Sequence, residues 1–141
     1  MQRKPWFKYF MEIALLVSER ATCNRLKVGC VLVKEKRIIA TGFNGSVSGT
    51  PHCIEEGCLV VDNHCIRTIH AEHNAILQCA KFGISTEGAT MYITHFPCFH
   101  CCKLLAQAGI KNIYYLHDYN NSNESKELLK AVGINFCKLE E

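Results

Sequence analysis

The chain has 141 residues, of which 48% are hydrophobic and 21% charged, and its formal net charge is +3. This length predicts a single domain spanning residues 1–141, and the small charge disfavours a dedicated duplex-binding protein, so we expect no stable nucleic-acid partner. No stretch approaches 18 apolar residues and the opening segment carries no export signal, so we expect no membrane partner and a cytoplasmic location.

The first half of the chain predicts one helix, a β-hairpin and a long loop. Apolar residues recur at helical spacing over residues 5–19. Two extended apolar runs, residues 28–33 and 38–41, flank a charged turn and predict the hairpin. Residues 42–68 are rich in glycine and polar side chains and lack convincing periodicity, so we expect a functional loop there.

The second half of the chain alternates between predicted helices and strands. Helices are expected over residues 69–82, 97–108 and 122–131, and strands over residues 89–94, 113–116 and 134–139. Gly83 stands where the C-terminal cap of the first of these helices belongs. The complete order predicts an α/β fold, a three-layer α-β-α sandwich built on a five-stranded mixed sheet.

Cysteine is unusually frequent, with ten residues in the chain. In a secreted protein such a number indicates disulfides, but without an export signal metal thiolates are the better interpretation. Three of the cysteines fall within apolar patterns, and we expect them to be small residues of the core: Cys30, Cys79 and Cys137.

Two predicted helices begin with residues that can bind a metal. His70 opens one, and Cys98 and Cys101, which follow a proline, open the next. The positive end of a helix dipole lowers the pKa of a nearby thiol, which favours the thiolates that zinc requires. These residues give three ligands, whereas structural zinc sites close with four, so the count indicates a catalytic zinc whose fourth ligand is water. Zinc lowers the pKa of such a water to about 7.

Glu72 lies two residues beyond His70, where it can reach the bound water without occupying the metal and act as general acid and base. The pattern H-x-E…P-C-x-x-C is the known signature of zinc deaminases. Taken singly, the Cys-x-x-Cys pair could be half of a structural zinc site or a redox pair. His70 could be an ordinary histidine, and Glu72 an acid favoured by the first turn of a helix. Their joint placement favours the catalytic interpretation.

On these motifs the chain resembles the deoxycytidylate (dCMP) deaminases of bacterial type, within the cytidine/deoxycytidylate deaminase superfamily. The similarity extends to the stretches RLKVG at residues 25–29 and TGFNG at residues 41–45, and to the Cys/His-rich residues 52–68. Cytidine nucleoside deaminases typically have Cys in place of His70. The tRNA adenosine deaminases share His-Ala-Glu but lack this Cys/His-rich insertion.

The resemblance implies a cytidine deaminase-like fold and the hydrolytic deamination of dCMP to dUMP and ammonia, which feeds dTMP synthesis. A zinc-activated water attacks C4 of cytosine, and Glu72 protonates N3 and then the amino group. The resemblance places Arg25 at the 5′-phosphate, with Lys27 as a weaker candidate, and a guanidinium suits phosphate. Asn44 contacts the deoxyribose and base region, and Tyr119 closes the pocket. Backbone near Ala71 is expected to hold the pyrimidine edge.

The resemblance also implies a homohexamer that dCTP with Mg²⁺ activates and dTTP inhibits. We expect the glycine-rich stretch from Gly42 to Gly49, which includes Phe43 and Gly45, to offer exposed backbone N–H groups to a triphosphate at a subunit boundary. Phe43 stands where the family usually has Tyr, which removes one hydroxyl.

Four cysteines remain outside the catalytic and core sets: Cys23, Cys53, Cys58 and Cys65. Four thiolates would complete a closed tetrahedral zinc site, which predicts a second, structural Zn²⁺. His52 and His64 are adjacent substitutes as ligands, and reduced surface thiols are the alternative to a metal site.

Two other functions are compatible with the motifs. The first is a non-catalytic protein with structural zinc, but such a site has no use for Glu72 as a proton carrier. The second is a deaminase of another cytosine or adenine nucleotide, or of a base in RNA, and the modest net charge disfavours a polynucleotide substrate.

Overall fold

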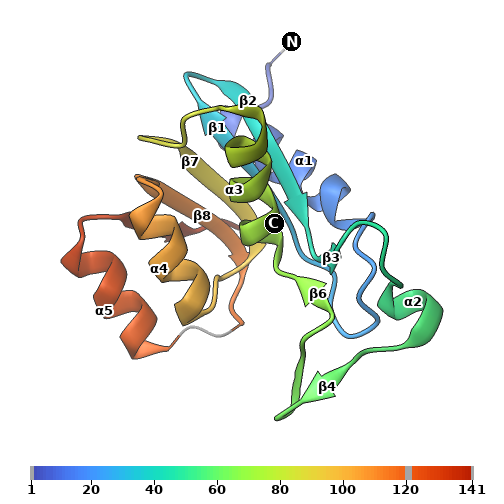
Figure 1. Cartoon of the computed structure of the whole chain (residues 1–141). Coiled ribbons are helices and arrows are strands. Elements are labelled where there is room, and N and C mark those ends of the chain that lie inside the picture. The colour runs from blue at the N-terminus through green and yellow to red at the C-terminus, as the bar shows by residue number, and fades with distance from the viewer. Residues whose placement is uncertain (1, 120–121, 141) are drawn as a thin grey trace.

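The β-branched runs of the sequence form one five-stranded sheet in the computed structural model, which describes residues 2–119 and 122–140 (Figure 1). The strand order is β2-β1-β7-β8-β9, with bounds Arg37–Phe43, Gly29–Lys34, Thr90–His95, Asn112–His117 and Asn135–Lys138. Strand β1 pairs antiparallel with both β2 and β7, whereas β7, β8 and β9 run parallel. The predicted five-stranded mixed sheet is therefore confirmed.

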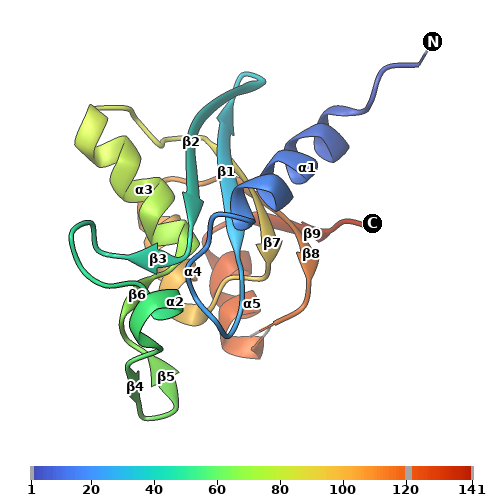
Figure 2. The ribbon, with the colours of Figure 1, turned by 90° about the vertical axis from the view of Figure 1, so that its right-hand side faces the viewer.

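Helices cover both faces of the sheet (Figure 2), and their bounds are α1 Trp6–Ser18, α3 Ala71–Phe82, α4 Phe99–Gln107 and α5 Asn123–Ala131. Helix α1 packs on one face, where Phe10 lies in a cluster with Val31 of β1. The other three helices pack on the opposite face, in a cluster that includes Leu32 of the same strand. Successive strand residues point to opposite faces, so β1 serves both layers. The predicted α-β-α sandwich is confirmed.

Two glycines bring the sheet into backbone contact with the helices. A Cβ atom at Gly42 of β2 would lie 2.2 Å from the carbonyl oxygen of Ala71, at the start of α3. A Cβ atom at Gly29 of β1 would lie 2.3 Å from the carbonyl oxygen of Ala14 in α1. Only glycine allows such an approach. The contact at Gly42 seats the first turn of α3 directly on the end of β2.

The long loop predicted after the hairpin contains five short elements: β3 Gly45–Ser46, α2 Cys53–Glu56, β4 Val60–Val61, β5 His64–Cys65 and β6 Thr68–Ile69. Strand β3 pairs with β6, and β4 pairs with β5 to form a hairpin. Among the side chains described in residues 47–69, which exclude that of His64, only Cys53 is buried. This insertion therefore has no apolar core of its own.

Two of the three cysteines expected in the core are buried there, namely Cys30 and Cys79. The prediction for Cys137 is wrong, because its side chain is exposed. Cys137 lies on β9, at the edge of the sheet, whereas α1 covers β1, β2 and β7. None of the helices in the described ranges is long and apolar enough to span a bilayer.

Candidate active site

The three predicted zinc ligands meet where α3 and α4 begin. His70 is the N-cap residue of α3 and Cys98 that of α4, and neither helix start has a side-chain cap hydrogen bond. The ligand atoms of His70, Cys98 and Cys101 all lie within 4.8 Å of one another. The Nδ1 atom of His70 is 3.3 Å from Sγ of Cys101 and 3.7 Å from Sγ of Cys98.

These separations fit a tetrahedral zinc ion. Bond lengths of about 2.3 Å to sulfur and about 2.0 Å to nitrogen place the two ligand atoms about 3.6 Å apart at the tetrahedral angle. The observed distances lie on either side of that value. The donor set of one imidazole and two thiols is also one that zinc prefers. The residues therefore fit the metal, and they leave one position open.

The electrostatics of the trio favour a thiolate at Cys98. Hydrogen bonds from Cys101 and then His70 lower the pKa of Cys98 to about 3, even though burial opposes this change. The contact with Cys98, burial and the nearby Glu72 raise the pKa of Cys101. The hydrogen bond with Cys98 raises the pKa of His70. Cys98 therefore loses its proton readily, whereas Cys101 retains its own and donates to the Cys98 thiolate.

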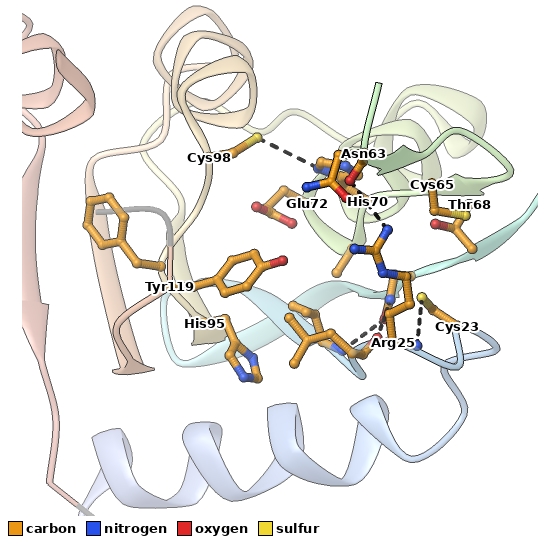
Figure 3. A pocket seen from close by; sticks show the side chains of 15 residues that line it. Cys23, Arg25, Asn63, Cys65, Thr68, His70, Glu72, His95, Cys98 and Tyr119 are labelled. Atoms are coloured by element: carbon orange, nitrogen blue, oxygen red, sulfur yellow. Dashed lines mark hydrogen bonds between the residues drawn. The ribbon is translucent and has the colours of Figure 1, made fainter. Parts of the chain in front are cut away.

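Glu72 lies in the first turn of α3 and is only 4% exposed. Figure 3 shows its carboxylate directed into the pocket, between Cys98 and Tyr119. Burial raises the pKa of this carboxyl, and hydrogen bonding with the Glu72 backbone, the nearby His70 and the Cys101 thiol oppose the rise. A carboxyl placed beside a metal site with a raised pKa is suited to both accepting and donating a proton.

A cavity of about 340 Å³ opens in front of the trio, within the range of small-molecule sites. It is lined by residues from five parts of the chain, including the β4–β5 hairpin: Cys23, Arg25, Leu26, Val28, Asn44, Asn63, Cys65, Thr68, His70, Ala71, Glu72, His95, Phe96, Cys98 and Tyr119. In Figure 3, Cys98 and Glu72 lie on one side of this pocket, and Arg25 and Cys23 lie on the other. The site combines a metal-binding end with a cationic end.

Four of the five predicted substrate-binding residues line the pocket, namely Arg25, Asn44, Ala71 and Tyr119. Lys27 is exposed and does not line it. The Arg25 guanidinium donates a hydrogen bond of 3.4 Å to the carbonyl oxygen of Asn63. Tyr119 is 58% exposed at the rim and meets the ring of His95 edge to face.

Asn44 fastens the segment that carries Arg25. Its Oδ1 accepts a hydrogen bond of 2.8 Å from the backbone of Val28, and its Nδ2 donates one of 2.7 Å to the carbonyl of Leu26. Both ends of the buried amide are therefore bonded to the strand entry. This role in positioning the pocket wall accompanies the predicted contact with substrate.

The predicted exposure of the glycine-rich stretch is wrong at two positions, because Gly42 and Gly45 are both buried. Gly42 lies against α3, and Gly45 lies against the ring of Phe43. Phe43 itself is half-buried, and its carbonyl accepts a hydrogen bond from Asn74. The exposed part of this stretch is residues 47–49.

Six of the residues that line the pocket had no predicted role, among them Asn63 and His95. Asn63 and its neighbour Asp62 have positive φ angles at the tip of the β4–β5 hairpin. An Asp-Asn pair between two β-branched residues and His-Cys is a turn signal that could have placed Asn63. His95 ends β7, and its position just before the Pro-Cys motif could have indicated a pocket residue.

The four remaining cysteines converge beside the same pocket. Sγ atoms of Cys23, Cys53 and Cys58 lie within 4.8 Å of one another, and Sγ of Cys65 is 3.7 Å from that of Cys53. Burial acts to raise the pKa of Cys65, but hydrogen bonds from the backbone of Arg67, Thr68 and Leu59 and from Cys53 lower it to about 6. Burial raises the pKa of Cys53 to about 12.

Comparison with known proteins gives sequence relatives along almost the whole chain. Residues 4–117 match the family described as "Cytidine and deoxycytidylate deaminase zinc-binding region". ComE operon protein 2 of Bacillus subtilis is 51% identical over 140 residues, covering 99% of this chain and 74% of that protein. Deoxycytidylate deaminase of Saccharomyces cerevisiae is 35% identical, covering 95% of this chain but only 45% of the yeast protein. This chain thus spans less than half of the yeast relative.

A solved structure is similar as well. The dCMP deaminase from the cyanophage S-TIM5, crystallised in complex with dCMP and dUMP, gives a TM-score of 0.84 at 35% sequence identity. The match covers 98% of this chain and 100% of the cyanophage chain. The fold is therefore cytidine deaminase-like, as the resemblance implied. The chain belongs to the cytidine and deoxycytidylate deaminase family.

Proposed function

We propose that the protein is a zinc-dependent hydrolytic deaminase that converts dCMP to dUMP and ammonia. The observation that carries this proposal is a single site in which a cluster of three candidate zinc ligands adjoins a pocket that is also lined by the buried Glu72 and by Arg25. When bound, the zinc ion polarises a water molecule and so supplies a nucleophile near neutral pH. The similar cyanophage structure, which holds dCMP and dUMP, supports the choice of substrate.

The proton transfers belong to Glu72. Its carboxylate accepts a proton from the water whose oxygen adds to C4 of the cytosine ring, and it passes that proton to N3. The remaining proton of the added oxygen is then carried to the amino nitrogen. The bond from C4 to that nitrogen breaks, and ammonia leaves. Because Glu72 is only 4% exposed, its carboxylate has little contact with bulk water.

The other pocket residues bind and orient the nucleotide. Arg25 lies across the pocket from Glu72 and offers donors to the 5′-phosphate. Tyr119 lies at the rim, where its ring can cover the base or sugar. Asn44 and the backbone at Ala71 face the same space from the floor of the pocket.

The test is the release of ammonia from dCMP, CMP, deoxycytidine, dCTP and a short single-stranded DNA. We expect the highest kcat/KM with dCMP, and loss of turnover when zinc is removed and recovery when it is restored. Faster turnover of the single strand than of dCMP would replace the proposal with a polynucleotide deaminase. Absence of turnover with all of these substrates in zinc-loaded protein would favour a non-catalytic zinc protein.

We also propose that a second, structural Zn²⁺ binds Cys23, Cys53, Cys58 and Cys65. Two observations support this site. The four thiols converge, although the described side chains of residues 47–69 include only one that is buried. Backbone N–H groups also donate hydrogen bonds to the thiol of Cys65. His52 is engaged by the hydroxyl of Thr22 at 3.0 Å, which favours the all-cysteine set. Metal analysis should give about two zinc ions per chain, by the ligand count. One zinc per chain in fully active protein would contradict the proposal.

For the assembly we propose a homohexamer that dCTP with Mg²⁺ activates and dTTP inhibits. The insertion carries a set of exposed aliphatic side chains, which a second subunit would bury on assembly: Val47, Ile54, Leu59, Val60, Val61 and Ile66. The exposed residues 47–49 are the part of the glycine-rich stretch that remains available to a triphosphate.

Finally, we propose that the protein acts in the cytoplasm and that residues 1–141 form one domain. All ten cysteines are free thiols, and two groups of them are poised to bind metal, which suits a reducing compartment. One sheet and its two cores unite the described residues from α1 to β9. Fractionation of cells, with the protein detected by antibody, tests the location.

A further inference from the structure

The four-cysteine cluster and Arg25 form one continuous wall of the pocket. Cys23 and Cys65 line the cavity together with Arg25 and Asn63. Figure 3 shows Cys23, Cys65 and Arg25 on the side opposite Cys98. The cluster is therefore not remote from the substrate, as a purely structural metal site would be, but adjoins the cationic end of the pocket.

A direct contact links the cluster to the backbone of Arg25. The backbone N–H of Arg25 donates a hydrogen bond of 3.4 Å to Sγ of Cys23. Between them, Asn24 donates a hydrogen bond of 2.8 Å from its side chain to the carbonyl of Cys53. The three-residue segment is thus fastened to the thiols and to the backbone that carries one of them.

A second contact links the cluster to the guanidinium of Arg25. The carbonyl of Asn63, at the tip of the β4–β5 hairpin, accepts the hydrogen bond from that guanidinium. The base of the hairpin is Cys65, which pairs with Val60. The Cys65 thiol and the carbonyl that contacts Arg25 therefore belong to the same short hairpin, two residues apart in the chain.

Hydrogen bonds rather than apolar packing hold these parts in place, among them those of Asn44 to Leu26 and Val28 and that of Arg67 to the carbonyl of Gly57. Arg25 is exposed, and so are the apolar side chains of the hairpin, such as Val60 and Val61. Apolar burial, which fixes most surface segments, is confined in the described side chains of residues 47–69 to Cys53. The thiols, and the metal that fits them, add a restraint on this wall of the pocket that apolar packing does not supply.

We infer that the cluster of Cys23, Cys53, Cys58 and Cys65 is a positioning site for Arg25, so that its occupancy by zinc sets the affinity for the phosphate of the nucleotide. The inference rests on the proposed function, in which Arg25 binds the 5′-phosphate. In this inference, bound zinc restrains the side chains of Cys23 and Cys65. Cys23 in turn restrains the backbone of Arg25, and the hairpin that carries Cys65 restrains the Asn63 carbonyl. The guanidinium of Arg25 is thereby oriented toward the phosphate before the nucleotide binds. Loss of the zinc ion from this cluster leaves proton transfer by Glu72 unchanged, but the orientation of Arg25 at the phosphate-binding end of the pocket becomes less restrained.

The test measures binding of dUMP and of deoxyuridine by calorimetry, which needs no turnover, alongside the zinc content. Cys58 belongs to the cluster but does not line the pocket, so Cys58→Ser removes a ligand without touching substrate. Cys137→Ser, at an exposed thiol outside the cluster, is the matched control. Cys58→His keeps a zinc ligand and tests rescue.

We expect Cys58→Ser to lose one zinc per chain and to bind dUMP about tenfold more weakly, the loss expected for one hydrogen bond to a charged group, with deoxyuridine unchanged. Cys58→His should restore both the zinc and the affinity, and Cys137→Ser should match the wild type. Loss of one zinc with unchanged dUMP binding, or equal weakening of both ligands, would overturn the inference.

If Cys58→Ser does not fold, Asn24→Ala decides the question, because it removes only the bond from the Arg25 segment to the Cys53 carbonyl. Selective weakening of dUMP with both zinc ions retained supports the inference, and unchanged binding of both ligands contradicts it. A wild-type protein that binds deoxyuridine as well as dUMP would instead count against Arg25 as the phosphate residue, and hence against the proposed substrate.

Discussion

Glu72 is the only acidic side chain that lines the pocket within the described parts of the chain. It is held in the first turn of α3, two residues beyond His70, and burial raises the pKa of its carboxyl. A glutamine at this position has nearly the same shape but cannot carry a proton. The position therefore allows proton transfer to be removed while the metal site is kept.

We expect Glu72→Gln to lower kcat for dCMP by about two to four orders of magnitude, the usual contribution of a general acid or base. Zinc content should stay at the wild-type value, because Glu72 is not one of the three ligands. Ammonia release and metal analysis check both points. Glu127→Gln, at an exposed acid of α5, is the control and should leave both unchanged. Full activity in Glu72→Gln would exclude the proposed proton transfers.

Arg25 is the only arginine or lysine among the residues that line the pocket in the described structure. We expect Arg25→Ala to raise KM for dCMP by about 10- to 100-fold, the range for hydrogen bonds to a charged group. The KM for deoxycytidine, which has no phosphate, should change little. Lys27→Ala is the matched control, because Lys27 is exposed nearby but does not line the cavity. Equal changes for both substrates would remove Arg25 from the phosphate site.

The sequence predicts the catalytic residues well because local spacing determines their geometry. His70 and Glu72 share one helix start, and Cys98 and Cys101 share another, so each pair could be placed without knowing the whole fold. Asn63 could not be placed in this way, since it reaches Arg25 across 38 positions of the chain through an irregular hairpin.

Among the secondary-structure elements, β2 and α3 meet through Gly42, where an added Cβ atom has no room beside the Ala71 carbonyl. We expect Gly42→Ala to lower the free energy of unfolding by about 1–3 kcal/mol, as for overpacking elsewhere. It should also lower kcat, because α3 must shift and Glu72 moves with it. Denaturant unfolding and ammonia release measure the two effects.

Gly29→Ala is the control for this prediction. The added Cβ atom would collide with α1, which packs on the opposite face of the sheet. Helix α1 contributes no residue to the lining of the pocket. A similar loss of stability is therefore expected, with kcat preserved at temperatures where the protein stays folded. Equal loss of kcat in both variants would mean that the contact at Gly42 does not position Glu72.

The long helices and the five sheet strands could be predicted from apolar periodicity, because each buries one face in a core. The five short elements of the insertion could not. Four of them are strands of only two residues, which is too short for a period to show, and their side chains are mostly exposed. Cys137 was misplaced because an apolar strand pattern does not reveal that its strand lies at the sheet edge.

At the scale of the whole molecule, the proposed regulation predicts cooperative kinetics. We expect sigmoidal dependence of the rate on dCMP, which becomes hyperbolic when dCTP and Mg²⁺ are added. Light scattering should give the mass of a hexamer of the 15.9 kDa chain. Val60→Lys, in the exposed aliphatic patch, should weaken assembly, whereas Leu77→Lys, at an exposed site on α3, is the control. Hyperbolic kinetics at every effector concentration would contradict the regulatory proposal.

The absence of side-chain caps on α3 and α4 has a consequence for amide hydrogen exchange. The first N–H groups of a helix have no partner within it, and at these two starts the N-cap residues are His70 and Cys98, which zinc would immobilise. Exchange with deuterium in those first turns should therefore speed up when a chelator removes the metal. Helix α5 begins at Ser122, whose hydroxyl accepts a hydrogen bond from the Ser125 amide, so its exchange should stay constant. Mass spectrometry of deuterated peptides could thus measure metal loading at the catalytic site against an internal reference, without any substrate.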